Sequence, residues 1–338
     1  MGDDIFEEKR FSFELYWVER EPWLKSHGYK LRPRFTPDWV PSWKTDPTKY
    51  NGRVWQAEDA QMTVQCDVGL DATRINDGLQ VYLKRVVKDS DERRIIEYLM
   101  DATIAQTAQR YVPFLEILDH IPNDPNYVLA VMPLLQDLRI PRFETIGECV
   151  DCVEQLLESV QFLHHHNIAH RTQRPPRYFL IDFGISIRFP ASETEPQAIR
   201  QLAGDLSVPE LIDPETYHDP YNPFPTDVYY LGNVIRRTFM REGDPIYVNQ
   251  GHLGLEFLRP LLNAMTHPDP SRRPTIDEAV TQLRQIVSSL SRWKLRSRVV
   301  LPKDNNFGGF ARFFPYLGRR IVYTICRVHP IPSRNVKA

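Results

Sequence analysis

The residues of this sequence that could do chemistry gather in the stretch from His170 to Gly184. An imidazole and a guanidinium open the stretch, at His170 and Arg171, and its second half is an apolar run that ends in an acid, Asp182. An aromatic residue, Phe183, and a glycine follow that acid. Imidazole, guanidinium and carboxylate groups carry protons and charge in binding and catalytic sites. The elements on either side of the stretch must therefore position these groups.

A second group of potential ligands, two cysteines and three histidines, lies just upstream. Cys149 and Cys152 form a Cys-x-x-Cys pair, and His164 to His166 form a run. A structural zinc site needs four such ligands, usually as two pairs, and no second cysteine pair accompanies this one. From Thr145 to His166 the apolar residues recur with a helical period. We therefore expect a helix with the cysteines on its surface and the histidines solvated at its end, and no zinc site.

The central stretch and the segments around it resemble the motifs of protein kinases. Leu163 to Arg171 resembles the approach to a kinase catalytic loop, and Asp182-Phe183-Gly184 resembles the motif that follows that loop. Three later segments come in kinase order: Val208-Pro209-Glu210 resembles the end of an activation segment, Asp227 to Gly232 the start of a central helix, and His267 to Thr275 a late motif that carries Arg273. The resemblance covers about Leu70 to Leu290. It implies an α+β, two-lobed protein-kinase-like fold with a small β-rich lobe and a larger α-helical lobe.

The resemblance also implies a site for ATP and Mg²⁺. Val81-Tyr82-Leu83-Lys84 resembles the third kinase strand, so Lys84 would hold phosphates, and Glu92, with Glu97 as the second choice, would orient Lys84. Asp182 would bind the metal, and Met132 would lie in the hinge that binds adenine through backbone groups. Five further residues would be structural: Phe183, Gly184, Glu210, Asp227 and Arg273, with Glu210 paired to Arg273 and Asp227 tied to the backbone of the catalytic loop.

The sequence departs from the kinase family at the residues that phosphoryl transfer depends on most. Thr172 stands in place of the catalytic aspartate. The metal-binding asparagine is missing as well. Only ten residues, Thr172 to Ile181, separate Arg171 from Asp182, too few for both the family's catalytic loop and the short hairpin that normally follows it. Met62 to Gly69 contains a single glycine where a glycine-rich loop is expected. His170 and Arg171 are thus remnants of a catalytic loop, and we assign no catalytic residue.

Three functional interpretations remain open, and they differ on whether the chain is an enzyme. The first is an ATP-dependent Ser/Thr kinase, the activity that the family implies, impaired or inactive in this chain. The second is a pseudokinase, a scaffold or binding module that keeps the fold without turnover. The third is a misspliced form of an active kinase, favoured by the abrupt join between Arg171 and Thr172 with normal motifs on both sides.

The first fifty residues are expected to form an extension ahead of the small lobe. Phe11 to Asp46 is rich in tryptophan and proline, which argues against a long helix and for an irregular strap that packs on a folded domain. The string from Trp23 to Trp43 resembles the leader of a group of kinase-like proteins expanded in mushroom-forming fungi. We expect four parts: an extension over 1–50, a small lobe over 51–133, a large lobe over 134–290 and a basic tail over 291–338. Within the small lobe, Asn76-Asp77-Gly78 between two apolar runs predicts a hairpin.

Composition and charge limit the compartment and the partners. The chain of 338 residues is 42% hydrophobic and 25% charged, and its four cysteines are too few and scattered for a secreted disulfide framework. With an acidic start and no long apolar run, we expect an intracellular, cytoplasmic protein. The net charge of −2 is unevenly divided, since the tail carries eleven Lys or Arg and one acid. That division argues against nucleic acid as the main partner, whereas the kinase resemblance implies a protein substrate or scaffold partner.

The basic tail is the candidate for contact with an anionic surface. The spacing of its apolar residues, Leu317, Ile321, Ile325 and Val328, is helical, and Pro315 is a good first helical residue. Such a basic amphipathic helix either docks on the folded domain or lies peripherally on an anionic membrane. The sequence indicates no oligomeric state.

Overall fold

The computed structural model describes residues 10–46, 48–51, 53–60, 68–101, 104, 111–135, 143–171, 180–200, 207–212, 219–240 and 252–299, and in the tail 318, 321–322, 325–326 and 329–331. The chain forms two compact units, one of residues 1–107 and 112–135 and the other of residues 108–111 and 136–338. The first unit is built on a β-sheet and the second is mainly helical, so the expected α+β class is confirmed.

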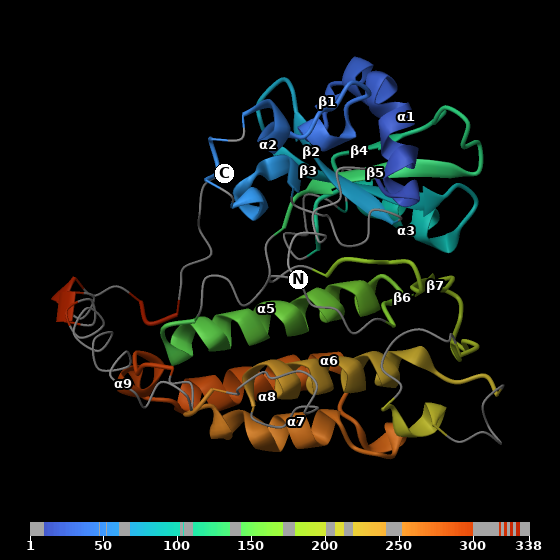
Figure 1. Ribbon diagram of the computed structural model, residues 1–338. Helices are drawn as coiled ribbons and strands as arrows, with labels where there is room; N and C mark the ends of the chain where they lie inside the picture. The colour runs from blue at the N-terminus through green and yellow to red at the C-terminus, as the bar shows by residue number, and fades with distance from the viewer. Residues whose placement is uncertain are drawn as a thin grey trace. The chain divides into compact units, whose positions relative to one another are not determined.

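The first unit contains a five-stranded antiparallel sheet in the order β1-β2-β3-β5-β4 (Figure 1). Its strands are β1 (Tyr29–Lys30), β2 (Gly69–Arg74), β3 (Gln80–Val87), β4 (Glu116–Leu118) and β5 (Tyr127–Pro133). The hairpin predicted at Asn76-Asp77-Gly78 is confirmed, since β2 and β3 pair through it. Asp77 Oδ1 accepts the N–H of Leu79 at 3.1 Å, and Gly78 has φ +74°, a conformation that glycine adopts without strain.

The N-terminal segment is helical, which contradicts the expected irregular strap. Helix α1 (Ser12–Ser26) contains Pro22, a residue that costs about 3 kcal/mol in a helix interior. Trp17 and Leu24 offset that cost because both are fully buried, and burying each large side chain contributes about 1.5–3 kcal/mol. Two short helices follow, η1 (Pro33–Phe35) and α2 (Ser42–Thr45).

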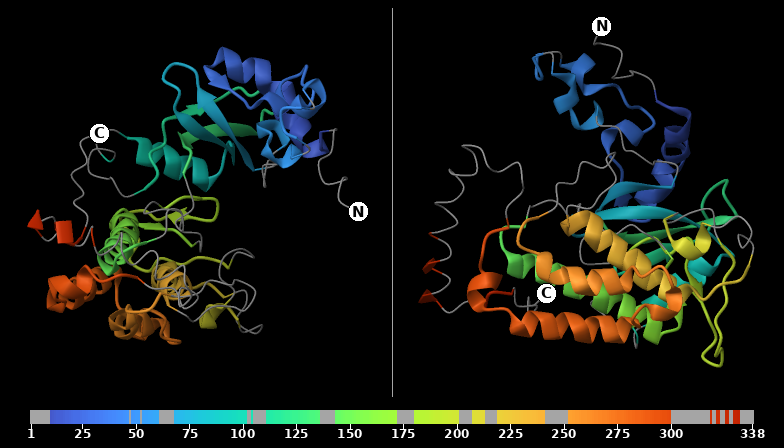
Figure 2. Two further views of the ribbon diagram at one scale, coloured as in Figure 1. Left: turned by 60° about the vertical axis from the view of Figure 1, so that its left-hand side comes forward. Right: turned by 90° about the horizontal axis from the view of Figure 1, so that it is seen from below.

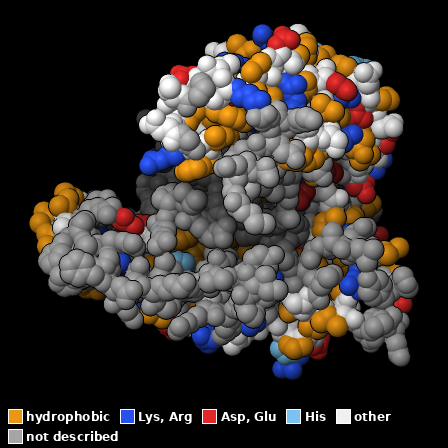
Figure 3. Space-filling view, viewed as in Figure 1, with side chains coloured by type: hydrophobic (Ala, Val, Ile, Leu, Met, Phe, Trp, Pro, Cys, Tyr) orange, Lys and Arg blue, Asp and Glu red, His pale blue; other side chains and the backbone are white. Residues whose placement is uncertain are grey.

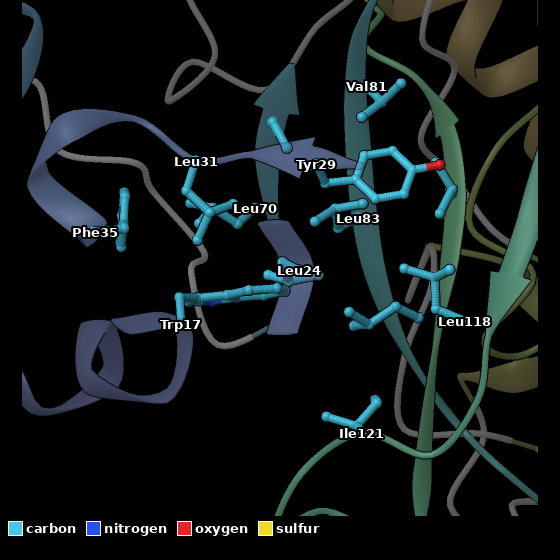
Figure 4. Packing of buried hydrophobic residues seen from close by; sticks show 13 residues of the cluster. Trp17, Leu24, Tyr29, Leu31, Phe35, Leu70, Val81, Leu83, Leu118 and Ile121 are labelled. Carbon is cyan, nitrogen blue, oxygen red and sulfur yellow. The ribbon is translucent and has the colours of Figure 1, made fainter. Parts of the chain in front are cut away.

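The N-terminal segment supplies five of the thirteen buried residues of one hydrophobic core. Figure 4 shows Trp17 and Leu24 facing Leu70 and Leu83 of the sheet. The remaining buried members of the cluster come from both parts of the unit: Tyr29, Leu31, Phe35, Ala72, Val81, Leu118, Ile121, Leu129 and Val131. The described part of the N-terminal segment, residues 10–46, thus packs on one face of this sheet and adds β1 to its edge. The opposite face packs on helix α3 (Asp91–Met100) through Ile96.

The second unit is a bundle of helices (Figures 1 and 2). Its helices are α5 (Ile146–His165), α6 (Pro223–Phe239), α7 (Arg259–Met265), α8 (Ile276–Ser289) and α9 (Arg292–Leu295), and β6 (Ile168–Ala169) pairs with β7 (Ile187–Arg188). Helix α5 packs against α6 and α8. Its first turn is closed by a capping box in which Thr145 and Glu148 bond each other's backbone N–H groups.

Cys149 and Cys152 lie inside the helix bundle, which corrects the expected surface position. Both residues are fully buried in α5, where cysteine packs as a small apolar residue. Burial raises the pKa of both thiols well above its usual value, so they stay protonated. Within the described part of the chain, no three His, Cys, Asp or Glu residues lie close enough together to hold a metal ion. None of the described helices is both long and apolar enough to cross a membrane.

The predicted tail helix falls largely outside the described residues. Of its apolar residues, Ile321 and Ile325 are described, and both are exposed. Farther along, the carbonyl of Pro330 lies against Gly147 in the first turn of α5, where a side chain would collide with it.

Candidate nucleotide-binding and loop-anchoring residues

Lys84 and Glu92 form an ion pair in the first unit. Alternation along β3 sends Leu83 into the core and Lys84 to the opposite face. Residues 88–90 alone connect β3 to α3, which Ser90 caps by accepting the N–H of Arg93 at 3.2 Å. That short link brings Glu92, in the first turn of α3, next to Lys84.

The ion pair is largely buried, so the loss of either partner would leave the other charge without compensation. The two side chains are only 10% and 11% exposed, so each charge depends on its partner. The N-terminal turn of a helix also favours a carboxylate, through the helix dipole. The second choice, Glu97, instead pairs with Arg93 at 2.8 Å and is 49% exposed. The arrangement leaves Lys84 as a cation on the sheet face that α3 partly covers.

Met132 lies on the same sheet face, directly opposite Tyr82 in the pairing of β3 with β5. It is buried, with 4% of its surface exposed. Of the residues that follow it, Pro133 has no N–H, and the N–H of Leu134 donates to Gln80 O at 2.9 Å. The first residues of the expected hinge thus continue the hydrogen bonding between β5 and β3.

Asp227 anchors the chain at His170 and Arg171 in the second unit. One carboxylate oxygen accepts the N–H of His170 and the other accepts the N–H of Arg171, both at 2.6 Å. His164 Nε2 lies 3.2 Å from the carboxylate as well. Asp227 is 3% exposed, and α6 positions it after Asn222 caps that helix. These bonds hold Arg171 at φ +61°, an uncommon conformation for a side-chain-bearing residue.

The Arg171 guanidinium ties two loop segments together. It donates to the carbonyl of Ile185 at 3.3 Å, to the carbonyl of Ile199 at 2.7 Å and to the hydroxyl of Tyr221 at 3.1 Å. The residue is 2% exposed. Sequence reasoning missed Tyr221, since its role depends on a contact fifty residues away in the chain that no local pattern indicates.

His170 packs against the aromatic residue that follows Asp182. Its ring lies 5.2 Å from the ring of Phe183, centre to centre, and Phe183 is fully buried. Ser186 Oγ donates to the carbonyl of His170 at 2.9 Å. Both ends of the central stretch are thus held together across the residues between them, 172–179, which include Thr172 and lie outside the described residues.

Asp182 has φ +69° and is partly exposed, and the neighbouring Gly184 is exposed. A carboxylate is a hard oxygen ligand of the kind that Mg²⁺ prefers. The structure places Asp182 in the second unit, whereas Lys84, Glu92 and Met132 belong to the first.

Glu210 and Arg273 form a bidentate ion pair, with nitrogen-to-oxygen distances of 2.7 and 2.6 Å. The Arg273 side chain is fully buried and that of Glu210 is 16% exposed. Thr226 donates to the same carboxylate at 2.9 Å, and the carbonyl of His267 accepts from Arg273 at 2.8 Å. Every charge in this cluster has a hydrogen-bonded partner, as a buried ion pair requires.

The strand beside β2 comes from the N-terminal segment, which sequence reasoning also missed. Tyr29 pairs with Arg74 and Lys30 with Thr73, and Arg32 continues the register with an ion pair to Asp71 at 3.0 Å. Residues 31–68 therefore connect β1 to β2. The expected position of a glycine-rich loop, Met62 to Gly69, lies at the end of this connection, and residues 62–67 of it are outside the described residues. A two-residue strand inside an aromatic segment carries no alternation that could have predicted it.

Comparison with known proteins supports a relationship to protein kinases. No protein-family model matches the chain. It is 26% identical to the dual specificity protein kinase zak2 of Dictyostelium discoideum over 202 residues, which cover 54% of this chain and 31% of that protein. It is also 26% identical to the putative ribosomal protein S6 kinase alpha-2 of Caenorhabditis elegans over 199 residues, 49% of this chain and 26% of the relative. The matches thus span about a third or less of these curated relatives, and they support a kinase-like superfamily.

Proposed function

We propose that this chain is a two-lobed, protein-kinase-like protein that retains a weakened site for ATP and Mg²⁺ and has lost most or all phosphoryl transfer. Lys84, oriented by Glu92, holds phosphate oxygens, and Asp182 contributes the metal ligand. The observation that carries the proposal is the anchoring of His170 and Arg171 by Asp227. The backbone that leads into a kinase catalytic loop is held in place, while the next residue is Thr172.

The expected loss of activity follows from the chemistry of phosphoryl transfer. Catalysis there consists almost entirely of positioning and electrostatic stabilisation. A threonine cannot accept the proton of a substrate hydroxyl as an aspartate does, and a chain without the loop asparagine has one metal ligand fewer. The fold then serves to bind a nucleotide or a protein partner, and a pseudokinase scaffold is the biochemical role that these losses favour.

A thermal-shift titration tests the nucleotide site. We expect the melting midpoint of the full chain to rise with ATP only when Mg²⁺ is present, and the Asp182→Asn variant to lose the rise. The absence of any shift in a cooperatively melting protein would contradict the nucleotide site and leave a scaffold without nucleotide. In a phosphotransfer assay on the same protein, we expect no transfer above a Lys84→Met control.

A second candidate is that the same gene also encodes an active kinase with a longer loop. It is favoured by the contact between His170 and Phe183, because residues on the two sides of the short segment still pack together as neighbours of that segment. Sequencing transcripts across the codons for Arg171 and Thr172 tests this candidate. If every transcript has the short join, the candidate is eliminated.

A further inference from the structure

Tyr82 stands beside Lys84 on one face of the sheet in the first unit. On this face the strand pairing forms two rows: Gly69, Lys84 and Ala130 in one, and Asp71, Tyr82 and Met132 in the other. Helix α3 packs farther along the same face, on Val86 and Val128, and the N-terminal segment packs on the other face. Tyr82 is therefore the large side chain between the expected hinge and the lysine.

The Tyr82 ring leans from its own row onto Gly69. A Cβ atom added to Gly69 would lie 2.6 Å from both Cζ and Oη of Tyr82, so the phenol end of the ring lies directly over the glycine. Because Gly69 is opposite Lys84, the ring runs diagonally from the row of Met132 to the row of the lysine. Diagonal neighbours of this kind are within reach of an aromatic side chain. Glycine is the residue that leaves room for the ring.

A nucleotide that joined these two rows would need the same space. If its base lay at Met132 and its phosphates reached Lys84, its base and ribose would cross the sheet over Tyr82. We propose that Tyr82 is a gate that covers the base position beside Lys84, so that the site accepts a polyphosphate more readily than a purine nucleotide. This inference rests on the proposed nucleotide site and names the residue that restricts it.

The gate has a quantitative consequence for nucleotide affinity. A ligand that binds only when the ring has swung away has its apparent affinity reduced by the fraction of molecules in that open state. Removal of the ring should therefore restore the full affinity for a ligand that has a base. The affinity for a ligand without a base should not change.

Calorimetric titration of the full chain with two probes tests the gate. The probes are ATP and inorganic tripolyphosphate, each with Mg²⁺, and the variants are Tyr82→Ala and Tyr82→Val, with Tyr82→Phe as the matched control that keeps the ring. Valine suits a strand and provides an opened variant if alanine impairs folding. Gly69→Ala is unsuitable, because its Cβ would also lie 2.6 Å from the carbonyl oxygen of Leu83.

We expect both opened variants to bind ATP about tenfold more tightly than the wild type and Tyr82→Phe, the gain predicted for a ring that is open in about a tenth of the molecules. Tripolyphosphate should bind all four proteins equally. ATP affinity that is unchanged or weaker in the opened variants would overturn the gate, while retained tripolyphosphate binding would leave the phosphate site standing. Failure of both probes on every protein would overturn the nucleotide site itself and the gate with it.

Discussion

The contribution of the Glu210–Arg273 ion pair to stability follows from its burial. Arg273 is fully buried and reaches its carboxylate through two hydrogen bonds. Attraction across a buried pair is largely offset by the desolvation of both ions, so the pair itself adds little. Loss of one partner has a different result, because it leaves the other charge buried and unpaired.

We therefore predict that Arg273→Ala and Glu210→Ala each lower the free energy of unfolding by about 3–5 kcal/mol. The matched control is Arg272→Ala, since Arg272 is the adjacent residue and is exposed, and surface substitutions of this kind usually change stability by less than about 0.5 kcal/mol. Urea unfolding of the three variants measures the difference. Equal midpoints for the Arg272 and Arg273 variants would show that the buried pair is not what holds this part of the chain.

At the scale of single elements, the N-terminal segment is the least predictable part of the fold. Its tryptophans and prolines argued against a helix, yet α1 forms because Trp17 and Leu24 fit between the sheet and the rest of the segment. Tertiary burial overrides local propensity here. In contrast, the hairpin at Asp77 and Gly78 and the long helix α5 were predictable, because turn chemistry and helical periodicity are local properties.

The residues of the candidate site likewise fall into those that the sequence predicts and those that it does not. Lys84, Glu92, Asp227, Glu210 and Arg273 could be selected from motif order. Strand alternation, however, is what puts Tyr82 on the lysine's face, and the pairing register is what aims its ring at Gly69. Contacts that join distant segments, such as Arg171 with Tyr221, leave no signal in a single sequence.

We predict that Trp17→Ala lowers the stability of the first unit by about 3–5 kcal/mol, as truncation of a large aromatic residue in a core does. The control is Trp55→Ala, since Trp55 is 55% exposed, and its loss should cost far less. Near-ultraviolet circular dichroism during denaturation, combined with hydrogen exchange of β2 and β3, measures both variants. If hydrogen exchange in the two strands is unchanged in Trp17→Ala, the N-terminal segment is a removable strap and not part of the core.

For the whole molecule, the charged residues are unevenly distributed between the tail and the rest of the chain. On the face that Figure 3 shows, the described Lys and Arg side chains are scattered among acidic and apolar ones and form no single basic patch. The basic excess lies instead in residues 291–338, which carry eleven Lys or Arg and one acid. Of the described apolar residues there, Ile321, Val322 and Ile325 are exposed, whereas Leu295 and Val299 are buried.

We propose from this division that the tail binds anionic lipid surfaces, and we predict that the full chain is retained by phosphatidylserine vesicles at low salt and released as salt screens the charges. Each basic residue near such a surface contributes about 1 kcal/mol, so Arg319→Glu combined with Arg320→Glu should reduce retention severely. The matched control, Lys25→Glu combined with Lys30→Glu, changes the net charge equally but lies on exposed positions of the first unit. Co-sedimentation measures all three proteins. Equal loss in both double variants would mean that net charge governs the association, and wild-type binding to neutral vesicles would mean that the apolar residues suffice.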